Sequence, residues 1–286
     1  MPIVDANRRH PYGDSPNPKR FGTVSPLDPE LFSRVDDFAD ELLKGNRSGK
    51  YSPLEVAQWL EELSETAARY LAGAESRLHG SDSPEFRRLA IDVEIQTGLG
   101  QFFARKLRAG VLYALHERSP DLPALQEALR AYRSARSAWA ALAKRASGVY
   151  AADITFGFDR HLRGHWMDRL QAIDDDIADM EKRLELAAAQ QFTPGPDEAR
   201  RIESALREVS ASPRRPRLRF EHVPPASFRP GQPVIIELKL GGLESRARPL
   251  SLRAHYRHVN QGEVYRVEPL RLERNHYRLT IPADYT

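Results

Sequence analysis

The sequence has no cysteine, which excludes disulfide bonds, thiolate metal sites and a cysteine nucleophile. It also has no apolar run close to the roughly 18 residues that a membrane-spanning helix requires, so no membrane partner is expected. The segment from Met1 to Arg9 lacks the apolar core of a signal peptide. We therefore expect a cytoplasmic chain by default, and an exported chain if a parent protein carries an upstream signal.

Motifs for cofactors and metals are missing as well. Gly98-Leu99-Gly100 lacks the third glycine and the preceding strand of a dinucleotide-binding loop. No Walker loop and no Gly-x-Ser-x-Gly elbow occurs. His161 and His165 are four residues apart, but Leu162 stands where a zinc protease motif needs glutamate. The sequence predicts no metal and no cofactor.

The composition is that of a folded protein with one or two domains. Of the 286 residues, 41% are hydrophobic and 29% are charged, which is typical of a globular chain rather than a disordered one. The net charge of +3 is unevenly spread, because residues 212–286 carry 14 Lys and Arg against 7 Asp and Glu. A basic region can bind nucleic acid. Arginines on the solvent face of a sheet explain the same excess, so nucleic acid is not the expected partner.

The first two thirds of the chain predict a helical bundle. Helix starts with a capping residue followed by proline occur at Asp28, Ser52 and Ser83, and a Leu122-Pro123 start follows. Apolar residues recur at helical spacing after each start. A fifth helix has an apolar seam spaced four and three residues apart, formed by Trp166, Leu170, Ile173, Ile177, Met180 and Leu184. About five long helices joined by short loops predict an antiparallel bundle.

Acidic residues on two of these helices are interpreted as solvent-facing. They are Asp36, Asp37, Asp40 and Glu41 on the first helix and Asp174, Asp175, Asp176 and Asp179 on the fifth. A divalent cation near Asp174–Asp176 is the alternative, and we disfavour it because Ile173 and Ile177 occupy the buried face.

After residue 215 the apolar period changes from 3.6 to 2, which indicates strands. The predicted fold is an α+β multidomain chain, with an antiparallel α-helical bundle followed by a small immunoglobulin-like β-sandwich. The expected divisions are an extended arm (1–27), the bundle (28–192), a linker with a short helix (193–215) and the sandwich (216–286). The alternating residues Tyr277, Leu279 and Ile281 predict a last strand with no partner on one edge. We therefore expect a truncated sandwich and a chain cut from something larger.

Two groups of residues are candidates for binding. The loop from Tyr150 to Trp166 gathers polar and aromatic side chains, namely Asp153, Asp159, His161, Arg163, His165 and Trp166. The alternative is a docked loop whose aromatic rings close the end of the bundle and whose Asp153 or Asp159 caps a helix. In the basic sheet, Arg253 and Arg257 are candidates for contact with an acidic glycan or nucleic acid. No residue is predicted to be catalytic.

Several stretches resemble a known group of enzymes. Tyr51-Ser-Pro-Leu-Glu-Val-Ala-Gln-Trp-Leu60 and Gly164-His-Trp166 resemble the helical region behind the catalytic barrel of large bacterial glycoside hydrolases, such as α-glucuronidase-like enzymes. Leu252 to Val259, Asn260-Gln261 and Ile281 to Thr286 resemble their closing β-sandwich. The resemblance implies a non-catalytic accessory region, because the catalytic carboxylates of that group sit on the barrel. Its implied partners are a catalytic domain, in cis or in trans, and a carbohydrate. The bundle is also a candidate surface for a homo-oligomer.

Overall fold

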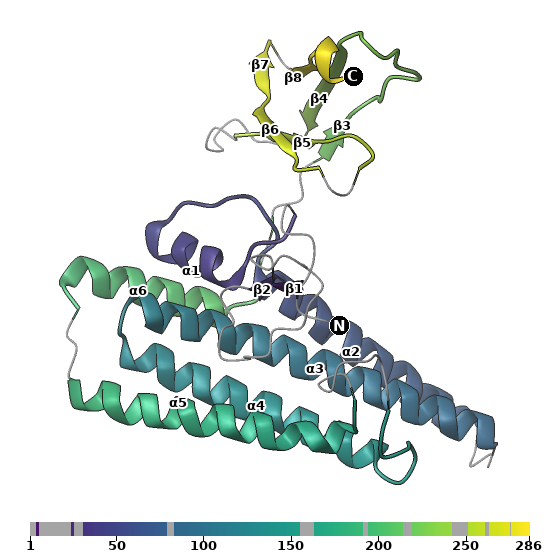
Figure 1. Ribbon diagram of the computed structural model, residues 1–286, viewed down its shortest axis with the longest axis vertical. Helices are drawn as coiled ribbons and strands as arrows, with labels where there is room; N and C mark the ends of the chain where they lie inside the picture. Colours follow the sequence, from purple (N-terminus) through teal and green to yellow (C-terminus); the bar gives the residue numbers. More distant parts are fainter. Residues whose placement is uncertain are drawn as a thin grey trace. The chain divides into compact units, whose positions relative to one another are not determined.

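The computed structural model describes residues 4–5, 24–25, 31–78, 83–154, 163–190, 194–213, 215, 219–241, 251–260, 263–274 and 276–286. The chain divides into two compact units, Met1–Pro213 and Arg214–Thr286. The first is mainly helical and the second contains six strands among its described residues (Figure 1). An α+β arrangement with a helical bundle and a small β region is therefore confirmed.

The helices of the first unit follow the predicted signals closely. They are α1 (Val35–Lys44), α2 (Pro53–Arg77), α3 (Pro84–Arg118), α4 (Leu122–Ala146), α5 (Leu170–Gln190) and α6 (Pro196–Ser210). Ser52 and Glu55 form a capping box at the start of α2. Ser83 and Asp121 accept backbone N–H groups at the starts of α3 and α4. Side-chain capping thus fixes where three of these helices begin.

The start of α1 differs from the prediction. The helix begins at Val35, seven residues after the predicted cap, because the preceding chain is extended and pairs with another segment. Phe32 forms an isolated parallel bridge with Tyr51, in which Ser33 N donates to Tyr51 O at 2.8 Å and Tyr51 N donates to Leu31 O at 2.9 Å. The helix ends at Gly45 as predicted, with φ at +74°.

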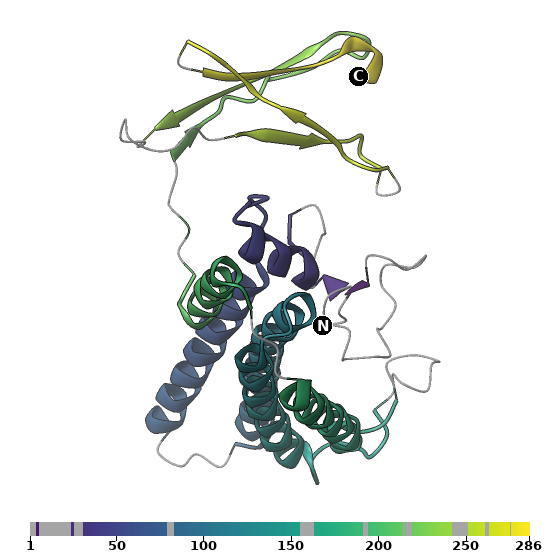
Figure 2. The same ribbon diagram turned by 90° about the vertical axis from the view of Figure 1, so that its left-hand side faces the viewer.

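Helix α3 is the centre of the first unit. It packs against α2, α4, α1 and α6, and α4 also packs against α5 (Figures 1 and 2). Two glycines of α3 allow its neighbours to approach closely. A Cβ atom on Gly98 would lie 2.7 Å from Leu142 Cβ of α4, and one on Gly100 would collide with Ser64 Oγ of α2. Close helix approach therefore explains the glycines, which the helix propensity scale alone would disfavour.

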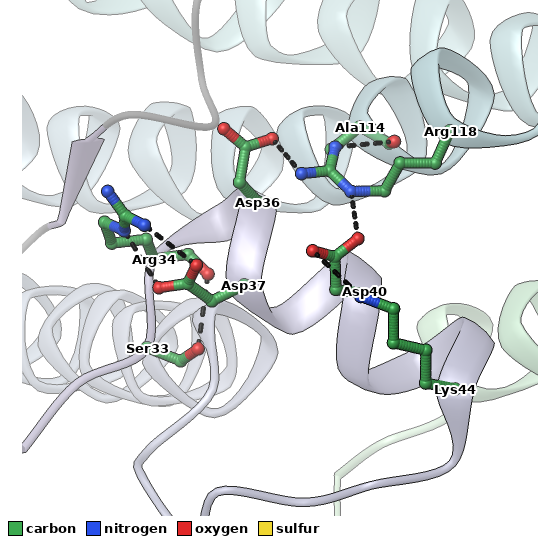
Figure 3. A network of polar contacts seen from close by, with 8 residues as sticks. All are labelled: Ser33, Arg34, Asp36, Asp37, Asp40, Lys44, Ala114 and Arg118. Atoms are coloured by element: carbon green, nitrogen blue, oxygen red, sulfur yellow. Dashed lines mark hydrogen bonds and ion pairs between the residues drawn. The ribbon is translucent and has the colours of Figure 1, made fainter.

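Ion pairs join α1 to the end of α3 (Figure 3). The Arg118 guanidinium contacts Asp36 Oδ1 at 2.8 Å and Asp40 Oδ1 at 2.6 Å, and it also donates to the Ala114 carbonyl. Asp37 accepts two hydrogen bonds from Arg34 of the preceding turn. These aspartates are partly exposed, as expected of a solvent-facing surface, but Asp36 and Asp40 are also bound by Arg118, which comes from a helix distant in sequence.

Helix α6 and the N-terminal segment add two further findings. Residues 193–215, the predicted linker, include α6, which packs against α1 and α3. In the predicted extended arm, strands β1 (Val4–Asp5) and β2 (Val24–Ser25) pair antiparallel. No sequence pattern indicates a regular element there, since two-residue strands are too short to show a period.

The second unit holds β3 (Arg219–Glu221), β4 (Val234–Gly241), β5 (Arg253–Tyr256), β6 (Arg266–Pro269), β7 (Arg271–Glu273) and β8 (His276–Ile281). One sheet has the order β3-β4-β8-β7, and β5 pairs with β6 in a second ladder (Figure 2). All of the described strand pairings in this unit are antiparallel. The buried apolar side chains among its described residues are Leu279 and Tyr285, so this unit has a thin core.

The position of β8 corrects the sequence interpretation. Its residues pair with β4 on one side and with β7 on the other, with Leu279 opposite Ile236 and Tyr277 opposite Leu272. The prediction of an unpaired last strand is therefore wrong, and the argument for a truncated sheet that rested on it no longer holds. The partner β7 was missed because its three residues are all exposed and carry no alternating pattern.

Candidate functional site

The predicted loop site is held together by Asp153. Its carboxylate accepts a hydrogen bond from Arg163 Nη2 at 2.8 Å and another from the Gly164 backbone N–H at 2.9 Å. Ile154 N also donates to Gly164 O at 3.0 Å. Asp153 and Arg163 therefore join the two ends of the loop to each other. Asp159 and His161, two further candidates, lie outside the described residues.

His165 starts the short 3-10 helix Trp166–Arg169 that leads into α5. Its Nδ1 accepts the Met167 backbone N–H at 3.1 Å, while the Asp168 carboxylate accepts the His165 backbone N–H at 2.7 Å. Since Nδ1 is an acceptor, the ring proton of the neutral imidazole is on Nε2. Nε2 is buried and has no hydrogen-bond partner among the described residues. His165 thus acts as a helix cap, by the same geometry that serine or aspartate uses elsewhere.

Trp166 ties this segment to the bundle. Its carbonyl oxygen accepts a hydrogen bond from Trp139 Nε1 of α4 at 2.8 Å. Its ring packs edge-on against Tyr150 at 5.3 Å, and the Tyr150 hydroxyl donates to Asp92 of α3. The aromatic and polar side chains of the described part of the loop therefore contact the bundle or one another. They match the alternative of a docked loop more closely than that of an open binding surface.

A buried polar cluster lies between α3, α4 and α5. Asp176 is only 5% exposed and accepts a hydrogen bond from the Tyr132 hydroxyl at 3.0 Å. Burial lowers the pKa of Lys106 to about 8, and the negative charge of Asp176 acts in the opposite direction. Burial, together with the Asp176 charge, raises the pKa of Tyr132. The prediction that Asp176 faces solvent is wrong, and the sequence signal for this cluster was its place on the same helix face as Ile173 and Met180.

The other aspartates of α5 have partners as well. Asp174 accepts two hydrogen bonds from Arg136 of α4, at 2.8 and 3.0 Å, and Asp175 accepts one from Gln171. Among the described ranges, no group of three or more His, Cys, Asp or Glu side chains is arranged to hold a metal ion. Asp174 therefore connects α5 to α4, whereas Asp175 pairs within α5.

A sizeable recess of the first unit lies between α2, α3 and α4, with a volume of about 440 Å³. Small and aliphatic residues form its floor, namely Ala68, Leu71, Ala72, Gly98, Ala138, Ala141 and Leu142. The polar lining residues are Glu75, Glu94, Thr97, Gln101 and Arg145, and Glu94 pairs with Arg145. This arrangement is a groove between helices rather than a reaction centre of ionisable groups.

In the second unit, Tyr285 is the centre of a polar and aromatic cluster. His258 donates to Glu263 Oε2 at 2.8 Å through Nδ1 and to the Tyr285 carbonyl at 2.7 Å through Nε2. The hydrogen bond to Glu263 is the main reason why the pKa of His258 is raised, and the bond to the Tyr285 carbonyl adds to it. The Arg266 guanidinium lies 4.0 Å from the Tyr285 ring centroid. This cluster fastens the last residues of the described chain to the β5–β6 ladder.

The two predicted arginines of the basic sheet have different surroundings. Arg257 stacks on the Tyr265 ring at 4.4 Å and reaches the Glu263 carbonyl. Arg253 is exposed on β5. Arg278, on the other sheet, lies between Glu237 and Glu273. Of these three described arginines, Arg257 and Arg278 contact other side chains of the unit, and Arg253 is exposed.

Comparison with known proteins gives little further information. No family model matches the sequence, and no curated protein matches it. Among solved structures, the chain is similar to one described as a GH138 enzyme targeting pectin rhamnogalacturonan II, with 14% sequence identity and a TM-score of 0.46. The similarity covers 54% of this chain and 23% of that one, so the chain matches less than a quarter of that enzyme's length. In the described part of the chain, no helix is long and apolar enough to cross a membrane.

Proposed function

We propose that this chain is a non-catalytic accessory region of a carbohydrate-active enzyme, and that it buttresses a catalytic domain. The observation that supports the proposal is that the described candidate residues of the loop make contacts within their own unit. Asp153, Arg163, His165 and Trp166 are engaged in hydrogen bonds or ring contacts within the unit. Side chains held in this way stabilise a scaffold and are poorly placed to exchange protons with a substrate.

The class of enzyme comes from the sequence resemblance to the helical and β-sandwich regions of large bacterial glycoside hydrolases. The narrower likeness to α-glucuronidase-like enzymes is part of the proposal. The partner is accordingly a catalytic barrel, in cis or in trans, and a carbohydrate is the substrate of the assembly rather than of this chain.

A paired experiment tests this function. The purified chain is assayed against a panel of glycosides, and it is also coexpressed with any barrel-encoding sequence that neighbours its gene. We expect no turnover by the chain alone and a higher unfolding temperature for the barrel in its presence, since binding to the folded state stabilises it. Robust turnover by the chain alone that Asp153→Ala or His165→Ala abolishes would contradict the proposal.

A second candidate function is the recognition of an acidic glycan by the β unit. The observation in its favour is Arg253, which is exposed and has no charged partner among the described residues. Binding to polygalacturonate is measured against salt, because purely electrostatic contacts weaken steeply, and retention above about 0.3 M indicates specific recognition. Arg253→Ala is expected to reduce binding, whereas the control Arg271→Ala, which removes the same charge from an exposed strand of the other ladder, is expected to change it little. Equal losses in the two variants would point to a general charge effect.

A further inference from the structure

Helix α2 carries an exposed apolar stripe. Trp59, Leu63 and Tyr70 are separated by four and seven residues, so they lie on the same side of the helix. Their exposed fractions are 38%, 67% and 74%. Ala57 and Ser64 are buried on the opposite side, toward α3. A row of large apolar side chains left open on one helix face is typical of a protein interaction surface.

The stripe is firmly held at its N-terminal end. The Trp59 indole packs edge-on against the Tyr51 ring at 5.1 Å and against the Phe32 ring at 6.3 Å. The parallel bridge between Phe32 and Tyr51 fixes these two rings in turn. A side chain that is already fixed loses little conformational entropy when a partner covers it.

The charged residues beside the stripe are acidic in the N-terminal half of the helix and basic in the C-terminal half. Glu55 and Glu62 flank its N-terminal half, and Arg69 and Arg77 flank its C-terminal half. Glu62 and Arg69 are two turns apart and both are exposed, so each can reach a partner along the same edge of the stripe. A second α2 running antiparallel would place the acidic half of one copy beside the basic half of the other. The stripe is therefore complementary in charge to itself.

The spacing around Thr66 gives the register of such a pair. Trp59 lies seven residues before Thr66 and Gly73 lies seven residues after it. With a twofold axis at Thr66, each Trp59 indole faces Gly73 of the second copy. Gly73 is open to the surroundings, with no atom within 4 Å of the position that a Cβ would take. A large ring opposite a residue without a side chain is complementary in shape as well.

We propose that α2 pairs antiparallel with α2 of a second copy of this chain, in a closed twofold dimer centred on Thr66. Trp59, Leu63 and Tyr70 form its apolar core, and Glu62 of each copy lies beside Arg69 of the other. A twofold interface uses the same patch on each copy, as this self-complementary surface requires.

Sedimentation equilibrium of the full chain tests the dimer. We expect a dimer at about 100 μM, where an interface with a micromolar dissociation constant is mostly occupied. Leu63→Glu is expected to make the chain monomeric, because it introduces a charge into the apolar core of the interface. A monomeric wild-type chain at this concentration would overturn the proposal.

Charge reversal tests the register. Glu62→Arg and Arg69→Glu are each expected to weaken the dimer by about fivefold to tenfold, since each replaces two opposite-charge pairs with like-charge pairs. The double variant restores the complementary arrangement and is expected to recover the wild-type dissociation constant. Glu75→Arg is the matched control, because Glu75 is exposed on the side of α2 that lines the recess toward α3 and α4, and its reversal is expected to change nothing. A double variant no tighter than either single variant would exclude this register.

Discussion

The Tyr132 hydroxyl donates a hydrogen bond to Asp176 across 3.0 Å inside the helical unit. Tyr132 is 1% exposed and Asp176 is 5% exposed, so the bond joins α4 to α5 away from water. A hydrogen bond to a buried carboxylate contributes more than one between neutral groups. It gives the bundle a specific contact in addition to its apolar seam.

Removal of this hydroxyl is expected to destabilise the protein. Tyr132→Phe keeps the ring and its packing but removes one hydrogen-bond donor to a buried acceptor, at a cost of about 2 kcal/mol in the free energy of unfolding. Tyr70→Phe is the matched control, since that ring is 74% exposed, and its effect is expected to stay within about 0.5 kcal/mol. Urea unfolding followed by circular dichroism measures the two variants. Equal effects would show that the buried hydrogen bond contributes nothing.

Two glycines in helices are expected to respond in opposite directions to alanine. Gly98→Ala places a methyl group 2.7 Å from Leu142 Cβ, so α3 and α4 must separate, at a cost of about 1 to 3 kcal/mol. Gly73→Ala meets no atom within 4 Å and is expected to stabilise the monomer by about 0.5 to 1 kcal/mol, through helix propensity. Thermal unfolding of dilute samples measures both changes. Stabilisation by Gly98→Ala would contradict the close helix contact.

Lys106 is expected to make stability depend on pH in the alkaline range. Its pKa falls from 10.5 to about 8 on folding, because burial disfavours the charged ammonium. Below pH 8 the folded protein carries the full cost of that charge. Between pH 8 and 10.5 the folded state releases the proton while the unfolded state keeps it, so the free energy of unfolding rises with pH.

The comparison of wild type with Lys106→Met isolates this contribution. The variant has no ammonium to desolvate, so its free energy of unfolding is not expected to rise between pH 8 and 10.5. Ionisation of tyrosines affects the two proteins alike, so the difference between their urea midpoints is the quantity to follow. Parallel pH profiles would show that Lys106 titrates normally in the fold.

His258 is expected to titrate above its ordinary pKa of 6.5, because Glu263 and the Tyr285 carbonyl both accept from its ring. Stability from the charged ring is fully present below pH 6.5 and is lost as the pH rises through the higher pKa of the folded state. NMR titration of the His258 ring protons measures this pKa directly. Glu263→Gln is expected to lower the pKa of His258, whereas the control Glu273→Gln, at a side chain that pairs with Arg278, is expected to leave it unchanged. An ordinary pKa for His258 in the wild type would show that its ring does not make these two hydrogen bonds.

Local signals predicted the helices well. The capping box of Ser52 and Glu55, Pro84 and Pro123, and Gly45 are short-range features, and each began or ended a helix where the sequence indicated. The start of α1 was placed too early because Phe32 pairs with Tyr51, about twenty residues later. Pairing between distant segments overrides a local cap, and a single sequence does not reveal it.

Predictions about polar groups were less accurate for the same reason. Asp36 and Asp40 were placed in solvent, yet Arg118 binds both, and Asp176 was counted with its exposed neighbours although it lies on the apolar face of α5. The loop residues Asp153 and His165 were singled out as binding candidates, and the structure shows both in hydrogen bonds within the segment. Two of their partners, Gly164 N–H and Met167 N–H, are backbone groups, which the side-chain pattern does not indicate.

The central place of β8 has a consequence for how the β unit folds. The innermost pair of the ladder between β4 and β8 is Leu238 with Tyr277, 39 residues apart (277 − 238), so a long chain segment must close before the ladder gains any stability. The helical unit is built largely from contacts between helices adjacent in sequence, which form quickly. We therefore expect the helices to form first, and the β unit to be the slower and more easily misassembled part of a newly made chain.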